Sequence, residues 1–300
     1  MASTAGNPSL LEAIVLGLVQ GLTEFLPISS TAHLRITPEL FGWPDAGAAY
    51  TAVIQLGTTL AVIIYFWKDI VHVLAALLKA IQTKSWLGTP EARLGWGVIL
   101  GTIPIAVVGL ALKKIIETHF RSLYVIASSL IVLAIVLFIV ERRAKHARTV
   151  TDITLRDSLV VGGWQTLALI PGASRSGTTL TGALLLGFKR EDAARFSFLL
   201  SIPATTLAGI FELKHFFEAP EKPWLALIVG TVVAFASGLA AIAWLLKFLK
   251  TRTTLVFVVY RIVLGLVLFA LLAAGILKAQ SGIENVTPET KTAPAKQVND

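Results

Sequence analysis

A polar segment, Pro171 to Thr179, lies between two apolar runs in the second half of the chain. It carries the guanidinium of Arg175, four hydroxyl groups and two glycines, and it has no acidic side chain. A guanidinium fork, hydroxyl donors and backbone N–H groups exposed at glycine are suited to binding a phosphate or diphosphate. Pro171 and Gly172 end one helix, and the small residues after them can begin another whose N-terminus points at the anion. The segment therefore predicts an anion site. The alternative is a polar helix break from which Arg175 reaches the lipid headgroups.

A second polar break lies in the first half of the chain, between Gln20 and His33. Gln20 and Glu24 are four residues apart, so both project from one face of a helix. An acid in an apolar segment must be neutral, paired with a cation or bound to a metal. His33 follows Ser30 by three residues, which predicts an activating or proton-relaying hydrogen bond between them.

The two breaks together supply an anion clamp, a nucleophile and an acid/base if they meet in the fold. The candidate catalytic residues are Glu24, Ser30, His33 and Arg175. The candidate phosphate contacts are Ser29, Thr31, Gly172, Ser174, Ser176 and Thr179. Two alternatives remain open: Ser29 is equally suited to capping the returning helix, and Glu24 with Arg175 is also consistent with a purely structural ion pair. Gln55, Gln165 and Arg261 are interpreted as supporting helix–helix hydrogen bonds.

The composition identifies an integral membrane protein with several spans. Of 300 residues, 55% are hydrophobic and 15% are charged, and the mean hydropathy is +0.76; soluble domains carry about 25% charged residues. The formal net charge is +8. In a membrane protein Lys and Arg mark cytoplasmic loops, so we interpret this charge as orientation and expect no nucleic-acid partner. The chain has no cysteine, which excludes disulfides and thiolate metal sites.

The hydropathy pattern predicts an all-α polytopic membrane protein. Six stretches are long and apolar enough to span: about 48–67, 95–112, 122–140, 193–213, 224–246 and 254–277. Two further regions, about 10–42 and 156–188, are interrupted by the polar breaks and are predicted to be re-entrant helical hairpins. A polar loop is expected near 68–94. We expect a polar N-terminus (1–9), a single membrane domain (10–278) and a disordered polar tail (279–300).

Short sequence echoes predict an internal repeat, with one copy at about 10–140 and the other at about 156–277. Thr58-Thr59-Leu60-Ala61 recurs as Thr205-Thr206-Leu207-Ala208. The densest basic cluster, Arg142 to Arg148, separates the copies and should be cytoplasmic. Six full spans and two re-entrant hairpins then make the second copy inverted relative to the first. Inverted repeats place their sites at the repeat interface, so the two hairpin tips should meet near the membrane midplane.

The motifs at the breaks resemble the two signatures of the bacterial undecaprenyl-diphosphatase family, the bacitracin-resistance phosphatases. They are Gln20-x-x-x-Glu24 with Pro27-x-Ser-Ser-Thr-x-His33, and Pro171-Gly-x-Ser-Arg-Ser-x-x-Thr179. Further similar stretches are Val53–Gly57, Phe196–Leu200 and Tyr260–Arg261, so the resemblance covers about residues 10–275. Gln20 is within the family pattern, but it replaces one potential carboxylate ligand for a metal.

The resemblance implies a membrane phosphatase that converts undecaprenyl diphosphate to undecaprenyl phosphate and phosphate. Such an enzyme recycles the lipid carrier for peptidoglycan and confers bacitracin resistance. It further implies the bacterial cytoplasmic (inner) membrane, membrane lipids as surroundings, a site opening to the periplasmic side and a homodimer as one assembly. The family positions that match are Glu24, Ser30, His33, Ser174, Arg175 and Thr179.

Two mechanisms and a second function class remain open from the sequence. Ser30 is the preferred nucleophile with His33 as its acid/base. The rival is a water activated by Mg²⁺ or Ca²⁺, which Glu24 and Gln20 would hold against the diphosphate. A lipid-phosphate transporter is the alternative function, because inverted repeats are typical of transporters and fold alone does not determine function.

Overall fold

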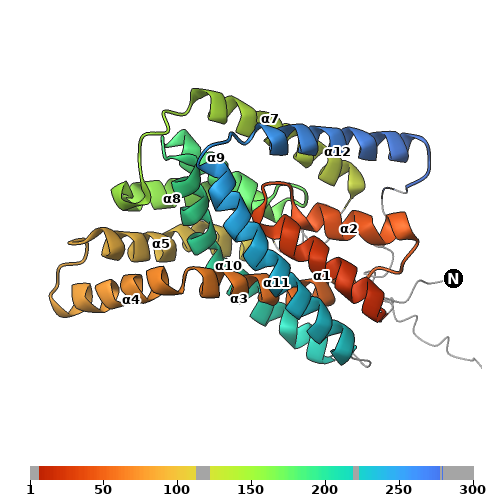
Figure 1. Cartoon of the computed structure of the whole chain (residues 1–300), viewed down its shortest axis with the longest axis horizontal. Coiled ribbons are helices and arrows are strands. Elements are labelled where there is room, and N and C mark those ends of the chain that lie inside the picture. The colour runs from red at the N-terminus through yellow and green to blue at the C-terminus, as the bar shows by residue number, and fades with distance from the viewer. Residues whose placement is uncertain (1–6, 113–121, 219–222, 278, 280–300) are drawn as a thin grey trace, which may run out of the picture.

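The computed structural model describes residues 7–112, 122–218, 223–277 and 279 (Figure 1). The first half contains α1 (Leu10–Phe25), α2 (Ser30–Phe41), α3 (Gly47–Tyr65), α4 (Trp67–Gln82), α5 (Pro90–Ala111) and α7 (Leu123–Arg143). The second half contains η1 (Val150–Asp152), α8 (Leu155–Thr166), η2 (Leu167–Leu169), α9 (Arg175–Leu185), α10 (Arg190–Glu218), α11 (Trp224–Leu249) and α12 (Leu255–Ala273). Within these ranges the only extended pairing is an isolated bridge between Arg148 and Phe188.

Several helices are long and apolar enough to cross a membrane, as the sequence predicts. In the described residues these are α5, α7, α11, α12 and the segment Arg190–Ile210 of α10. A further candidate is the pair formed by α3 and α4, which is bent by 74° at a short break. The chain is therefore an all-helical, multi-pass membrane protein, and large apolar side chains such as Leu110 (79% exposed) cover its outer surface. The predicted tail, 279–300, lies outside the described residues apart from Ala279, as do residues 1–6 of the predicted polar N-terminus.

The predicted polar loop near 68–94 is wrong over most of its length, because α4 occupies residues 67–82. Its apolar residues, Ile70, Val73, Leu74 and Leu77, recur at the spacing of one helix face, and they line an apolar groove with α5 and α10. Charged residues flank this run, with Lys68 and Asp69 before it and Lys79 after it, and they make the stretch look polar in a simple hydropathy scan. The helix packs closely on α5, where a Cβ at Gly95 would lie 2.7 Å from the Leu77 side chain.

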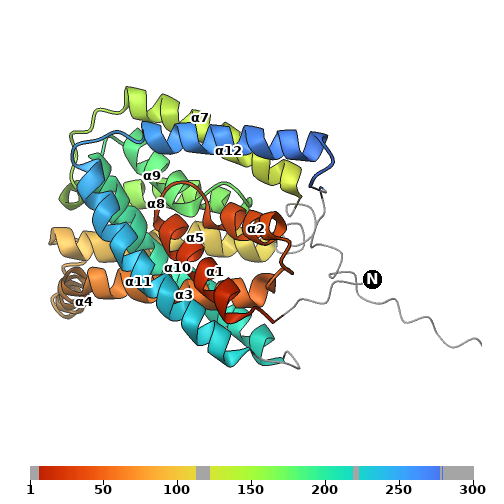
Figure 2. The ribbon, with the colours of Figure 1, turned by 45° about the vertical axis from the view of Figure 1, so that its right-hand side comes forward.

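The helices pack in pairs that combine the two halves of the chain. α1 packs on α11 and α8 packs on α5, while α3 contacts α10 and α7 contacts α12 (Figures 1 and 2). Glycines allow the backbones of the first two pairs to approach closely. A Cβ at Gly17 would lie 2.5 Å from the carbonyl oxygen of Gly230, and a Cβ at Gly162 would lie 2.3 Å from that of Gly101. Neither contact leaves room for a larger residue.

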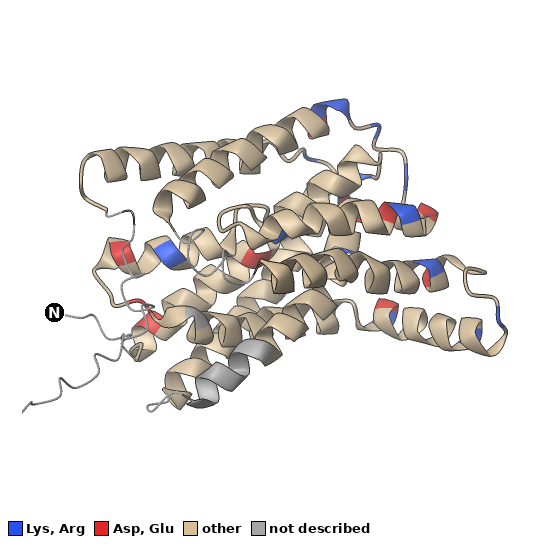
Figure 3. Cartoon of the chain, turned by 180° about the vertical axis from the view of Figure 1, so that it is seen from behind, with Lys and Arg blue, Asp and Glu red and all other residues tan. Residues whose placement is uncertain are grey.

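Charged side chains gather at one end of this bundle. Figure 3 shows most Lys and Arg residues at the end opposite the N-terminus, with few charges along the middle of the helices. Glu141 and Asp157 are buried there, paired with Arg190 and Arg148, respectively. The main apolar core, which includes Phe25, Leu184 and Phe196, is fully buried between the helices.

Candidate active site at the two helix breaks

The two breaks predicted from the sequence have nearly the same backbone geometry. Ser29 is the N-cap of α2 with φ 76° and ψ 97°, and Ser174 is the N-cap of α9 with φ 68° and ψ 108°. Each cap oxygen accepts from the backbone N–H three residues later, at 3.4 Å from Ala32 and 3.1 Å from Gly177. Positive φ at a non-glycine residue is uncommon and persists only where surrounding contacts impose it. Both serines therefore cap helices, as the alternative interpretation of Ser29 expected.

The two tips meet in the interior of the protein, as the sequence predicts. The backbone N–H of Gly172 donates to Thr31 Oγ1 at 3.4 Å. Ser176 Oγ, also of the second tip, donates to the carbonyl oxygen of Leu26 at 3.0 Å. The second tip therefore donates two hydrogen bonds to the first, and residues about 145 positions apart in the sequence form one local structure.

Glu24 is the centre of the site and accepts from four side chains. Oε1 accepts from Arg175 Nη2 at 2.5 Å and from Gln55 Nε2 at 2.9 Å. Oε2 accepts from Ser30 Oγ at 2.7 Å and from Gln20 Nε2 at 3.1 Å. The Glu24 and Arg175 side chains are only 4% and 14% exposed. A buried carboxylate of this kind is tolerable because it is paired and hydrogen-bonded on both oxygens.

A cavity of about 150 Å³ lies beside this cluster. Its polar lining consists of Glu24, Ser29, Ser30, Thr31, Gln55, Ser174, Arg175 and Thr205. Ile105, Ala168, Ala204 and Ala208 form the apolar part of the wall. Because α2 and α9 both begin at this cavity, the positive ends of two helix dipoles face it. One guanidinium, several hydroxyls and two helix N-termini make the cavity suitable for a phosphate group.

His33 does not form the expected hydrogen bond with Ser30. Its Nδ1 donates to the carbonyl oxygen of Ser29 at 2.7 Å, so Nε2 accepts from the Tyr260 hydroxyl at 2.6 Å. The two rings are stacked, with 5.6 Å between their centroids. On α2, residue 33 projects from the turn toward α12, whereas Ser30 faces Glu24 of α1. The base within reach of Ser30 is therefore Glu24.

Gly172, Ser176 and Thr179 were expected to contact phosphate, but they do not line the cavity. The Thr179 hydroxyl is fully buried between α9 and α10, where it donates to the Arg175 carbonyl at 2.7 Å and lies 2.5 Å from Ser197 Oγ. A Cβ at Gly172 would lie 2.3 Å from Ser129 Oγ. These residues use their polar groups to hold the second tip, and their contact with phosphate stays a prediction.

Three polar residues to which the sequence analysis gave no catalytic role contact residues of the two tips or Glu24. Gln55 of α3 donates directly to Glu24. Tyr260 of α12 contacts His33, and Arg261 donates from Nη2 to the carbonyl oxygens of Gly172 and Ala173 at 3.3 and 3.0 Å. The available signal was a polar side chain within an apolar span, but it does not specify the partner.

The residues present offer little to a resident metal ion. Among the described residues, no three His, Cys, Asp or Glu side chains lie close enough to share an ion. Glu24 is a single carboxylate, and both of its oxygens already accept hydrogen bonds. Mg²⁺ and Ca²⁺ take six or more oxygen ligands in most sites. Glu24 and Gln20 alone do not form such a site.

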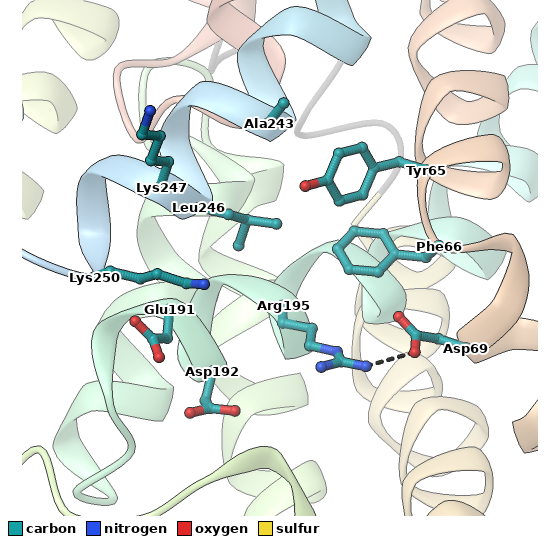
Figure 4. Close-up of a pocket in the computed structure, with 10 residues that line it drawn as sticks. All are labelled: Tyr65, Phe66, Asp69, Glu191, Asp192, Arg195, Ala243, Leu246, Lys247 and Lys250. Atoms are coloured by element: carbon teal, nitrogen blue, oxygen red, sulfur yellow. Dashed lines mark hydrogen bonds and ion pairs between the residues drawn. The ribbon is translucent and has the colours of Figure 1, made fainter.

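A larger cavity of about 380 Å³ lies at the charged end, between α10, α11 and the α3–α4 break (Figure 4). Arg195 and Asp69 form an ion pair in its wall, with 2.5 Å between Nη2 and Oδ1. Glu191 and Asp192 lie in the first turn of α10, where the helix dipole favours negative charge. Lys247 lies in the last turn of α11, where the dipole favours positive charge. This cavity contains none of the residues at the two breaks.

Comparison with known proteins finds one family along most of the chain. Residues 13–267 match the family model described as "Bacitracin resistance protein BacA". The chain is 67% identical over 296 residues to the undecaprenyl-diphosphatase of Myxococcus xanthus, covering 97% of this chain and 100% of that protein. It is 52% identical to the undecaprenyl-diphosphatase of Prosthecochloris aestuarii, covering 90% and 100%. It is 47% identical to undecaprenyl-diphosphatase 2 of Streptomyces coelicolor, covering 91% and 99%.

Proposed function

The chain belongs to the bacitracin resistance protein BacA family, and we propose that it hydrolyses undecaprenyl diphosphate to undecaprenyl phosphate and inorganic phosphate. This hydrolase activity recycles the lipid carrier for cell-wall synthesis and confers bacitracin resistance. The observation that carries the proposal is the meeting of Glu24, Ser30 and Arg175 beside a cavity where α2 and α9 begin. It joins a nucleophile, a base and an anion clamp inside a membrane protein.

Recognition of the diphosphate begins with Arg175. Its Nη2 donates a hydrogen bond to Glu24, and the side chain lines the cavity. A terminal phosphate takes hydrogen bonds from the guanidinium and from the hydroxyls of Ser29, Thr31 and Ser174. The helix N-termini stabilise the charge on its oxygens, and the same groups offset the charge that develops in the transition state. The apolar prenyl tail lies between the helices.

Ser30 is the proposed nucleophile, and Glu24 is the group that takes its proton. Ser30 Oγ is already hydrogen-bonded to Glu24 Oε2 at 2.7 Å, which is the reach that general-base catalysis needs. The oxygen attacks the terminal phosphorus, the bond from phosphorus to the bridging oxygen breaks, and undecaprenyl phosphate leaves. The oxygen of a water molecule then attacks the same phosphorus, and the bond from phosphorus to Ser30 Oγ breaks. The proton held by Glu24 returns to Ser30 Oγ, and inorganic phosphate leaves with the protons of the water. His33 stays a predicted acid/base for this second step.

A divalent cation, Mg²⁺ or Ca²⁺, enters this scheme only with the substrate. Diphosphate oxygens supply the hard ligands that the chain lacks, and Glu24 with Gln20 would complete its shell on the protein side. The ion would neutralise phosphate charge. Each residue role above stands without it.

We further propose six full spans and two re-entrant hairpins arranged as an inverted repeat in the bacterial inner membrane. In this arrangement α1 is equivalent to α8, and α5 is equivalent to α11. The α1–α11 pair is then equivalent to the α8–α5 pair, and each of these pairs has a close glycine contact. Each of the pairs α3–α10 and α7–α12 joins equivalent helices of the two repeats. The Lys- and Arg-rich end is cytoplasmic and the site opens to the periplasm. A homodimer stays a prediction.

The direct test is release of phosphate from undecaprenyl diphosphate by the purified protein in detergent. Detergent removes the second compartment, so a pure transporter gives no product there. We expect turnover by the wild type and its loss in Glu24→Gln, which removes the base and leaves Arg175 without an ionised partner. Arg195→Lys, in the cavity of Figure 4, is the matched control and should turn over normally. No phosphate release by well-folded wild type would refute the proposal.

A further inference from the structure

The helix α12 contacts both tips through two neighbouring residues. The Tyr260 hydroxyl lies 2.6 Å from His33 Nε2, next to the first tip. The adjacent guanidinium of Arg261 donates from Nη2 to Ala173 O at 3.0 Å and to Gly172 O at 3.3 Å, in the second tip. It also reaches Ser129 O of α7 at 3.4 Å. α12 therefore connects the two halves of the site from one rigid element.

Arg261 is buried to an unusual degree for its charge. It is 1% exposed, and its acceptors are backbone carbonyl oxygens. In the described part of the chain no acidic side chain forms an ion pair with it, and its Nε has no hydrogen-bond partner. A buried charge is costly unless it is compensated. An anion bound nearby would supply that compensation.

Arg261 lies directly behind the first turn of α9. A Cβ at Gly177 would lie 2.9 Å from Arg261 Nη1, and Gly177 donates to Ser174, which lines the cavity. Arg175, by contrast, is paired with Glu24. Of these two cations, Arg261 is thus the one that has no acidic partner among the described residues.

Tyr260 acts on the first tip through His33. The imidazole donates from Nδ1 to Ser29 O and accepts from Tyr260 at Nε2. Ser29 is the N-cap with positive φ, so its carbonyl orientation determines how α2 leaves the tip. The stacked phenol ring limits rotation of the imidazole. Tyr260 therefore orients the His33 imidazole, which in turn is hydrogen-bonded to Ser29 in the first tip.

We propose that Tyr260 and Arg261 are positioning residues that set the two tips against each other, and that Arg261 supplies the uncompensated positive charge that favours diphosphate binding. This inference rests on the proposed function of the site. Arg261 acts on KM through its charge and on kcat through its clamp on the Gly172 and Ala173 carbonyls, while Tyr260 acts on kcat alone through His33.

The test measures kcat and KM for undecaprenyl diphosphate in detergent for Arg261→Lys, Arg261→Met and Tyr260→Phe. Arg261→Met should raise KM and lower kcat, each by about 10-fold or more, because charge and clamp are both lost. Arg261→Lys keeps the charge, so KM should return near the wild-type value while kcat stays low. Tyr260→Phe should lower kcat several-fold at unchanged KM.

Control variants keep the roles of charge and folding apart. Tyr124→Phe on α7 and Arg195→Lys near Asp69 remove similar groups that do not line the cavity at the tips, and both variants should match the wild type. Should Arg261→Met fail to fold, the kcat–KM split of Arg261→Lys and Tyr260→Phe still decides. The inference would be overturned if both variants kept the wild-type kcat and KM. It would also be overturned if both lost kcat/KM equally, with no difference between them in how kcat and KM change. An inactive wild type would instead refute the proposed function.

Discussion

At the scale of single residues, the buried pair of Glu24 and Arg175 is consistent with either a stabilising or a catalytic role. A buried ion pair is poor support for stability, because desolvation offsets most of the Coulomb attraction. Here both oxygens of Glu24 are filled by donors from α1, α2, α3 and α9. Such convergence is hard to explain as stabilisation alone, whereas a phosphate that takes over Arg175 would free Glu24 to act as a base.

Substitution Arg175→Lys separates charge from geometry at this position. Lysine keeps the positive charge but lacks the planar fork that donates to Glu24 and to phosphate together. We expect turnover to fall by about 10²-fold or more, the scale of one lost transition-state donor. Steady-state phosphate release measures this, with Arg195→Lys as the control. Near-normal turnover would remove Arg175 from the mechanism.

At the scale of elements, the two breaks form one site because each orients a helix N-terminus toward the same cavity. The second break depends on Gly172, which has φ 88° and whose absent Cβ leaves room for Ser129 Oγ. Its N–H and carbonyl group link the tip to Thr31 and Arg261, respectively. A side chain here would therefore disturb both links.

Gly172→Ala should lower the melting temperature and reduce activity, because alanine is strained at positive φ by about 1–2 kcal/mol before any steric clash is added. Gly163→Ala on α8 is a matched control, since a Cβ there meets nothing within 4 Å. That variant should melt at or above the wild-type temperature, because alanine favours the helix. Thermal unfolding in detergent and phosphate release compare the two. Equal behaviour of both variants would contradict the role given to Gly172.

Sequence patterns predicted the helices, the two breaks and their meeting, because Pro, Gly and Ser interrupt otherwise apolar regions at equivalent positions. They failed for α4, because Lys68, Asp69 and Lys79 near its two ends made the stretch look polar although its apolar residues form one helix face. They also misplaced the partner of His33, since a spacing of three residues suggested Ser30, while the actual partner Tyr260 is 227 residues away. Contacts between remote helices depend on packing, which local patterns do not encode.

At the scale of the whole molecule, helices of the first half pack on helices of the second. The inverted repeat proposed from this packing predicts the side of the membrane on which each loop and terminus lies. The chain has no native cysteine, so single-cysteine variants need no background removal. Asn7→Cys and Ala279→Cys should react with an impermeant maleimide in intact cells of a strain that makes the protein. Lys145→Cys should react only after permeabilisation. Termini on opposite faces would contradict the inverted repeat.

We propose that the two helix tips build one phosphatase site in which Ser30 attacks phosphorus. The most direct measurement is a rapid acid quench of the purified enzyme with undecaprenyl diphosphate labelled in its terminal phosphate, followed by peptide mapping. We expect labelled phosphate on Ser30 within the first turnover, and neither label nor turnover in Ser30→Ala. Unlabelled protein during active turnover, together with an active Ser30→Ala variant, would contradict this proposal.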